Sequence, residues 1–175
     1  VTKLGIGSGD TVLEAGLGSG GLSLHLAKVL GNSGHLVTAE PRKEHASVGL
    51  LNLQRASECF EEFPKHTHLE GMVEDVVPDI EFDAIILDMP AHSPAISSCS
   101  PHLVFGGRLA CYAPTTSQLE ACWKASEEAG LTEEWAGELM ERQWGVTSKG
   151  GMRPVNGPFG HTAFFGDSFF SLKMF

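Results

Sequence analysis

The sequence predicts an α/β protein built on one open, doubly wound sheet that is mostly parallel, with an antiparallel strand at one edge. Up to Gly130, short apolar runs rich in β-branched residues alternate with longer helix-like stretches. Such alternation implies parallel strands joined by right-handed crossovers, with helices on both faces of the sheet. After Gly130, strand-like segments follow one another without a helix, which permits an antiparallel pair.

The individual elements follow from apolar periodicity and from glycine and proline breaks. Strands are expected at residues 11–15, 35–40, near 68, 82–87 and 108–112. Helices are expected at residues 20–30, 42–59, 95–104 and 117–129, with a loop at 76–81.

The last part of the chain departs from this rhythm. Residues 131–146 have strand character near their end, and residues 161–165 are expected to form a final short strand. Between them, residues 145–160 are rich in glycine and contain two prolines, so a loop is expected there. The tail at 166–175 is apolar and has no assigned role.

Composition and charge narrow the class of protein. Of the 175 residues, 42% are hydrophobic and 19% charged, as in an ordinary globular protein, so a single domain over residues 1–175 is expected. No apolar run is long enough to cross a bilayer, and residues 1–10 do not resemble a secretory signal, so an intracellular protein is expected, in the cytoplasm or a mitochondrion. The net charge of −10 argues against a broad basic face that grips nucleic acid.

The cysteines suggest neither a metal site nor a disulfide framework. They lie far apart without CxxC pairing, and we expect reduced, half-buried side chains at Cys59, Cys99, Cys111 and Cys122.

The run LEAGLGSGGL at residues 13–22 carries the strongest functional signal. Gly16, Gly18 and Gly20 follow a buried strand and open a helix, which allows a turn tight enough for a cofactor to lie against the main chain. Because Gly21 completes the dinucleotide fingerprint GxGxxG, an NAD-dependent oxidoreductase remains an alternative at this point.

Acidic residues help to distinguish the two cofactor classes. Glu40, about 20 residues after the glycines, suits ribose hydroxyls in either class. Glu14 is expected to point its carboxylate to the carboxyl edge of the sheet, where the ammonium group of a methionine would be held. A dinucleotide has no such cation, so Glu14 favours S-adenosylmethionine. Asp75, in the loop expected after the third strand, suits an adenine amino group.

A second motif follows the strand expected at residues 82–87. Asp88, Met89 and Pro90 place an acid at the carboxyl edge of the sheet, where ligands lie in open α/β folds. The tripeptide is similar to the DPPY-like motif with which amino-methyltransferases of nucleic-acid bases hold the target amine, although an acid capping the next loop is the alternative. Together with the glycine loop, it indicates a Rossmann-like methyltransferase with Asp88 as its catalytic residue.

These motifs, in order over nearly the whole chain, resemble the catalytic domain of the tRNA (adenine(58)-N(1))-methyltransferase family. The matching segments are GDTVLEAGLGSGGLSLHLA from Gly9, the EPRKEH run from Glu40, FDAIILDMP from Phe82, the YAPTTSQLE run from Tyr112, ERQWGV from Glu141, RPV from Arg153 and GHTAFF from Gly160. The resemblance implies methylation of ring nitrogen 1 of the T-loop adenosine of tRNA by in-line displacement from S-adenosylmethionine, without a metal.

The resemblance also implies which residues form the site. Cofactor contacts are expected from Glu14, Gly16, Gly18, Ser19, Gly20, Gly21, Leu22, Glu40, His45, Asp75 and Asp88. The target base, also held by Asp88, is expected beside Met89, Pro90, Tyr112, Thr115, Gln118, Arg153 and His161. His45 and Gln118 are equally well explained as residues at helix starts, and His161 as a packed core histidine.

The chain departs from the family pattern in ways that bear on tRNA binding. Family members carry a small β-rich domain before the glycine loop, whereas that loop begins at residue 13 here. The aromatic residue after the DMP-like motif is replaced by AHS, and GDSFFSLKMF replaces the usual basic ending. We therefore expect tRNA contacts from a homo-oligomer, a tetramer in the family, or from a non-catalytic tRNA-binding subunit. The alternatives are a methyltransferase of the same fold acting on a small molecule or a protein, and an inactive tRNA-binding subunit.

Overall fold

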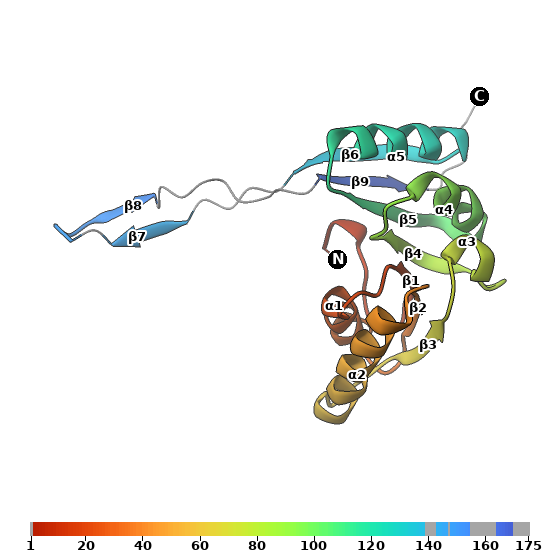
Figure 1. The fold of residues 1–175 in the computed structure, drawn as a ribbon, viewed down its shortest axis with the longest axis horizontal. Coiled ribbons are helices and arrows are strands. Elements are labelled where there is room, and N and C mark those ends of the chain that lie inside the picture. The colour runs from red at the N-terminus through yellow and green to blue at the C-terminus, as the bar shows by residue number, and fades with distance from the viewer. Residues whose placement is uncertain (1, 139–142, 147, 155–163, 170–175) are drawn as a thin grey trace.

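The computed structural model describes residues 2–138, 143–146, 148–154 and 164–169, without the side chain of Arg153. The strands of the main sheet are β1 (Thr11–Ala15), β2 (His35–Ala39), β3 (Lys65–Leu69), β4 (Phe82–Leu87), β5 (Leu103–Ala113), β6 (Thr132–Glu138) and β9 (Phe164–Phe169). Their order is β3-β2-β1-β4-β5-β9-β6 (Figure 1). The first five strands pair in parallel, and β9 is antiparallel to both β5 and β6. The predicted fold class, with its antiparallel pair at one edge, is confirmed.

Helices cover both faces of this sheet, so that successive residues of β1, β2 and β4 are buried on both sides. The helices are α1 (Gly21–Leu30), α2 (Lys43–Cys59), α3 (Val73–Val76), α4 (His92–Cys99) and α5 (Thr116–Glu128). Leu26 of α1 and Leu53 of α2 join one buried cluster with Leu36. Ile96 of α4 joins the cluster on the opposite face with Leu13, together with residues of α3 and α5. None of the helices in the described ranges is long and apolar enough to cross a membrane.

The path of the chain determines where a ligand can bind. Leu13 of β1 lies opposite Val37 of β2 on one side and Ile85 of β4 on the other. The chain runs outward from β1 to β3 and then returns to β4 on the other side of β1. Ligands of open α/β sheets bind at such a switch point, beyond the carboxyl ends of the strands.

The region between β4 and β5 differs from the expectation of a helix at 95–104 and a strand from 108. Helix α4 begins at His92 and ends at Cys99, and β5 begins at Leu103. The reason is Pro101, which cannot donate the next helical hydrogen bond, so that α4 passes into a short 3-10 turn. Within β5, Gly106 has a φ of +83° and accommodates an irregular register against β4.

The loop expected at 145–160 is wrong in part. Strands β7 (Trp144–Val146) and β8 (Met152–Pro154) form a separate antiparallel hairpin that extends beyond the main sheet (Figure 1). Gly150 and Gly151, with φ values of +81° and +84°, lie between them and permit a sharp reversal of the chain. Strand β9 (Phe164–Phe169) includes the end of the strand expected at 161–165 and extends into the tail, whereas residues 161–163 lie outside the described residues.

Candidate active site at the carboxyl edge of the sheet

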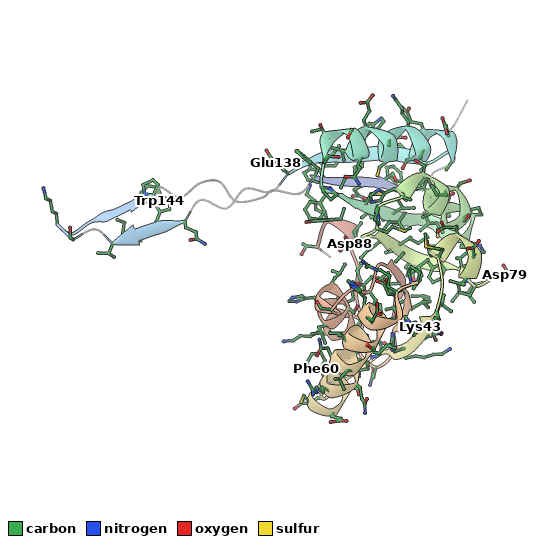
Figure 2. All side chains as sticks on the ribbon, in the orientation of Figure 1. Lys43, Phe60, Asp79, Asp88, Glu138 and Trp144 are labelled. Atoms are coloured by element: carbon green, nitrogen blue, oxygen red, sulfur yellow. The ribbon has the colours of Figure 1, made fainter. Side chains whose placement is uncertain are left out.

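A cavity of about 260 Å³ opens at the carboxyl ends of β1, β2 and β4, at the switch point of the sheet. Figure 2 shows Asp88 near the middle of the main body, between the halves that carry α2 and α5. The cavity is lined by Ala15, Gly16, Ala39, Glu40, Pro41, Arg42, Gly71, Met72, Val73, Asp88, Met89, Pro90 and Ala91. The glycine loop and the DMP motif, far apart in sequence, therefore share one cavity.

Gly16 joins these two motifs through the main chain. Its φ of +95° lies in the region that favours glycine, and a Cβ atom there would lie 1.9 Å from the carbonyl oxygen of Asp88. The backbone N–H of Asp88 donates to the carbonyl oxygen of Ala15 at 2.8 Å, and that of Gly16 donates to Ala39 at 2.9 Å. The ends of β1, β2 and β4 are thus tied together at the position where only glycine fits.

Glu40 presents a buried carboxylate to the same cavity. It accepts hydrogen bonds from Nε of Arg42 at 2.8 Å, from Nη2 of Arg42 at 3.1 Å and from the backbone N–H of Gly18 at 3.3 Å. Burial raises the pKa of Glu40, but these hydrogen bonds and the charge of Arg42 outweigh it, and the pKa lies below its usual value. The Arg42 side chain is 57% exposed and can move aside, which would free the ionised carboxylate for ribose hydroxyls.

This geometry predicts opposite roles for the two partners. Glu40→Gln should weaken the binding of S-adenosylmethionine by about tenfold or more, because a charge-assisted hydrogen bond is lost. Arg42→Gln should leave the affinity unchanged or tighten it, since the carboxylate no longer has a competing partner. Isothermal titration of both variants checks this, and equal weakening by both would contradict the role of Glu40.

Asp88 is exposed at the cavity and available as an acceptor. Among the described residues, no donor hydrogen-bonds its carboxylate. Partial burial raises the pKa of Asp88, and the nearby charge of His92 acts in the opposite direction. The Asp88 carboxylate therefore lies in the cavity wall and can accept a hydrogen bond, as is required of a group that binds an amine.

Glu14 lies beneath the first turn of α1 and does not line the cavity, unlike its neighbours Ala15 and Gly16. It is 1% exposed and accepts a hydrogen bond from Oγ of Ser23 at 2.5 Å. Burial raises its pKa to about 8, Ser23 opposes the shift and the charge of Asp88 adds to it. Its contact with a methionine ammonium group stays a prediction.

The raised pKa of Glu14 makes a prediction about stability. Because the unfolded chain releases this proton near pH 4.5 and the folded chain only near pH 8, Glu14 costs stability increasingly between these values. The free energy of unfolding of Glu14→Gln should therefore increase relative to that of the natural protein, by a few kcal/mol in all, as the pH rises through this range. Above this range the difference between the two proteins should stay constant. Urea unfolding at pH 5, 7 and 9 measures this difference, and a difference independent of pH would show that Glu14 is ionised in the fold.

The other predicted residues of the glycine loop, Gly18 to Gly21, are not part of the cavity lining, and their cofactor contacts stay predictions. A Cβ atom on Gly20 would lie 3.2 Å from the carbonyl oxygen of Gly49, so α1 and α2 approach closely here. Gly49 is a residue that the sequence reasoning missed. The carbonyl oxygen of Ser19 accepts from Nδ2 of Asn52 at 2.9 Å, and Gly21 begins α1.

Three further predicted cofactor residues, Leu22, His45 and Asp75, also lie outside the lining of this cavity. Leu22 lines a different cavity, of about 340 Å³, together with Leu4 and Ile86 on the face that carries α1. His45 is exposed on α2. Asp75 is exposed on α3, a short helix that replaces the expected loop, although Gly71, Met72 and Val73 just before it do line the cavity.

The predicted substrate residues are divided between two places. Met89 and Pro90 line the cavity beside Asp88. Tyr112 packs edge-on against Phe165 of β9, with ring centroids 5.2 Å apart. The predictions for His161 and for the side chain of Arg153 lie outside the described residues.

Thr115 and Gln118 act together at the start of α5. Oγ1 of Thr115 accepts from the backbone N–H of Gln118 at 3.3 Å and donates to its Oε1 at 2.9 Å. This N-cap favours the helix-start interpretation of Gln118. Within the part of the chain that the structure describes, no group of three or more His, Cys, Asp or Glu side chains is arranged to hold a metal ion.

Comparisons with known proteins agree with this geometry. Residues 1–162 match the model of a family described as "tRNA methyltransferase complex GCD14 subunit". The tRNA (adenine(57)-N(1)/adenine(58)-N(1))-methyltransferase TrmI of Methanocaldococcus jannaschii is 28% identical, over 94% of this chain and 66% of its own length. The tRNA (adenine(58)-N(1))-methyltransferase TrmI of Thermus thermophilus is 31% identical, over 94% of this chain and 63% of its own. The chain thus spans slightly less than two thirds of these relatives.

A solved structure shares nearly the whole fold. It is a SAM-dependent O-methyltransferase from Thermotoga maritima, with a TM-score of 0.85 and 27% identity, covering 99% of this chain and 63% of that one. As an O-methyltransferase, it is named for a different acceptor atom from those of the two relatives. The fold therefore indicates the use of S-adenosylmethionine, while the acceptor must be argued from the site.

Proposed function

Because the chain belongs to the family of tRNA methyltransferase complex GCD14 subunits, we propose that it transfers a methyl group from S-adenosylmethionine to ring nitrogen 1 of the T-loop adenosine at position 58 of tRNA. The observation that carries this proposal is the shared cavity. Gly16 from the glycine loop and Asp88 from the DMP motif meet there, with the space for a Cβ atom on Gly16 taken by the Asp88 backbone.

The residues around the cavity fit the proposed cofactor. Gly16 leaves the main chain bare at the cavity wall, and Glu40 supplies an ionised carboxylate that suits ribose hydroxyls. Met72 and Val73 offer apolar surface that suits the face of an adenine ring. When bound, S-adenosylmethionine supplies an electrophilic methyl group on its sulfonium.

Asp88 is the proposed catalytic residue. Its carboxylate accepts a hydrogen bond from the exocyclic amine of the target adenine and stabilises the positive charge that grows on the base during methylation. Met89 and Pro90 flank it and provide apolar contacts that limit how the base can lie. This arrangement orients the ring nitrogen and contributes electrostatic stabilisation, so that no covalent enzyme intermediate is required. The base must leave its stacked position in tRNA, at a cost of a few kcal/mol.

The proposed tRNA contacts require more than one copy of this chain or a second subunit. The net charge of −10 disfavours a polyanion unless basic groups come from elsewhere. The family description itself refers to a complex. Three apolar side chains of the β7–β8 hairpin are more than half exposed, namely Trp144, Val146 and Met152, and Figure 2 shows Trp144 far from Asp88. Exposed apolar groups of this kind suit a subunit contact, either in a homo-oligomer or with a non-catalytic tRNA-binding subunit.

The place of action follows from the proposed substrate. An enzyme that modifies tRNA works where tRNA is present, which places this one inside the cell, in the cytoplasm or in a mitochondrion.

Transfer of labelled methyl groups tests the proposal. The natural full-length protein, with any partner that co-purifies, is incubated with labelled S-adenosylmethionine and unmodified tRNA. We expect incorporation into tRNA and none when the adenosine at position 58 is replaced by uridine. Equal labelling of both tRNAs would exclude this target, and labelling only of small-molecule or protein acceptors would favour a methyltransferase of the same fold with another substrate.

A further inference from the structure

His92 is a buried titratable residue to which neither the sequence motifs nor the proposed mechanism assign a role. It is the first residue of α4, four positions after Asp88, and is only 4% exposed. The loop of Asp88, Met89, Pro90 and Ala91, all of which line the cavity, thus ends on this side chain. A buried imidazole at the end of such a loop requires hydrogen-bond partners.

The partners of His92 come from two other elements. Its Nε2 lies 3.0 Å from the carbonyl oxygen of Tyr112 in β5, and because a carbonyl can only accept, Nε2 carries the proton and donates. Cys122 of α5 also acts on the imidazole and raises the pKa of His92. His92 therefore connects the loop that carries Asp88 to the end of β5 and to α5.

Two ionisable groups act on this imidazole, the carboxylate of Asp88 and the side chain of Cys122, and Cys122 is in turn influenced by Cys111. Burial alone lowers the pKa of His92, but Cys122, the Tyr112 carbonyl and the charge of Asp88 raise it above its usual value. Cys111, and then His92, lower the pKa of Cys122. Cys122, the Tyr112 carbonyl and Asp88 thus favour a positive charge on His92, against the effect of its burial.

We propose that His92 is a positioning residue of the methyl-transfer site, which fixes the loop that carries Asp88 against β5 through its hydrogen bond to the Tyr112 carbonyl oxygen. The proposal rests on the proposed function, since it assigns His92 a part in the reaction attributed to Asp88. The hydrogen bond to Tyr112 supplies the geometric part of this role. The charge of the imidazolium adds an electrostatic part, because an opposite charge nearby favours the ionised form of a carboxyl group.

Two substitutions separate these parts. Gln at position 92 can place an amide N–H near the position of Nε2 and restore the donor to Tyr112, but it carries no charge. Phe at position 92 supplies neither. His25→Gln is the matched control, because His25 is exposed on α1 and lies outside the cavity lining.

For His92→Phe we expect kcat to fall by about tenfold or more, since the buried carbonyl of Tyr112 loses its donor, with the Kd for S-adenosylmethionine within about threefold of the natural protein. For His92→Gln we expect most of kcat to return at high pH, while the acidic limb of the pH–rate profile lies about one unit higher than in the natural protein. His25→Gln should match the natural protein throughout.

A measurement that needs no activity keeps this proposal distinct from the proposed function. The Asp88 carboxyl group, followed by 13C NMR and identified with Asp88→Asn, should titrate at a higher pH in His92→Gln than in the natural protein. An unchanged Asp88 titration would overturn the electrostatic role. If His92→Phe kept its melting temperature and its kcat, the positioning role would be overturned as well. Failure of the natural protein to methylate tRNA, with the titration shift present, would instead count against the proposed function alone.

Discussion

Asp88→Ala should reduce kcat for tRNA methylation by about 10²- to 10³-fold, the effect typical of removing one preorganised group that stabilises transition-state charge. The Kd for S-adenosylmethionine should stay within a few-fold, because Gly16 and Glu40 are untouched and the main-chain contacts of residue 88 do not need its side chain. Single-turnover rates and equilibrium binding, measured on the same preparation, separate the two effects. Asp88→Asn should be nearly as impaired, since an amide lacks the negative charge.

The control for this substitution is Asp79→Asn. Asp79 is an exposed acid that Figure 2 shows on the outer part of the main body, and it does not line the cavity. It should leave both kcat and Kd unchanged. If Asp88→Ala turned over at the natural rate, Asp88 would have no part in the chemistry and the target base would have to be held by another group.

Gly16→Ala should have the second large effect, on both stability and cofactor binding. A methyl group there would lie 1.9 Å from a backbone carbonyl oxygen, which cannot move without separating β1 from β4. The control is Gly18→Ala, whose φ of +52° is also positive but whose Cβ would have no neighbour within 4 Å.

The two alanine variants separate the cost of an unfavourable backbone conformation from the cost of the close contact with the Asp88 backbone. Gly18→Ala should lower the free energy of unfolding by about 1 kcal/mol, the cost of a left-handed conformation. Gly16→Ala should lose at least about 2 kcal/mol more, in the range of severe overpacking, and should lose detectable binding of S-adenosylmethionine. Denaturant unfolding and calorimetry measure these quantities. Equal losses in the two variants would mean that the close approach of Gly16 to Asp88 is not present in solution.

The parts of this fold that the sequence could predict are those determined by local pattern. The strands at Thr11–Ala15 and Phe82–Leu87 match their predicted bounds, because each is an apolar β-branched run bounded by polar or turn residues. The start of β5 could not be placed, since Gly106 and Gly107 interrupt its apolar run. The strand character expected near the end of residues 131–146 agrees with β7, but its partner β8 was missed because three residues are too few for a periodic pattern to be recognised.

In the candidate site, too, some residues could be predicted from the sequence and others could not. Gly16, Glu40 and Asp88 were predicted, and they share a cavity because the carboxyl ends of parallel strands meet at one edge. The position of Leu22 could not be inferred, since it depends on how α1 rotates against the sheet. The role of His92 was missed because its partners Tyr112 and Cys122 come from later parts of the chain. The sequence signal that could have revealed His92 is a histidine two residues after the DMP motif, which itself follows a buried strand.

On the proposed function, methyl transfer in this cavity is directed to one atom of one tRNA base. Mass spectrometry of nucleosides from tRNA methylated by the natural full-length protein, with digestion to locate the modified fragment, tests it most directly. We expect 1-methyladenosine in the T-loop fragment at position 58, absent from the product of Asp88→Ala. Methylation of another base, or of the exocyclic nitrogen of adenine in place of ring nitrogen 1, would contradict it.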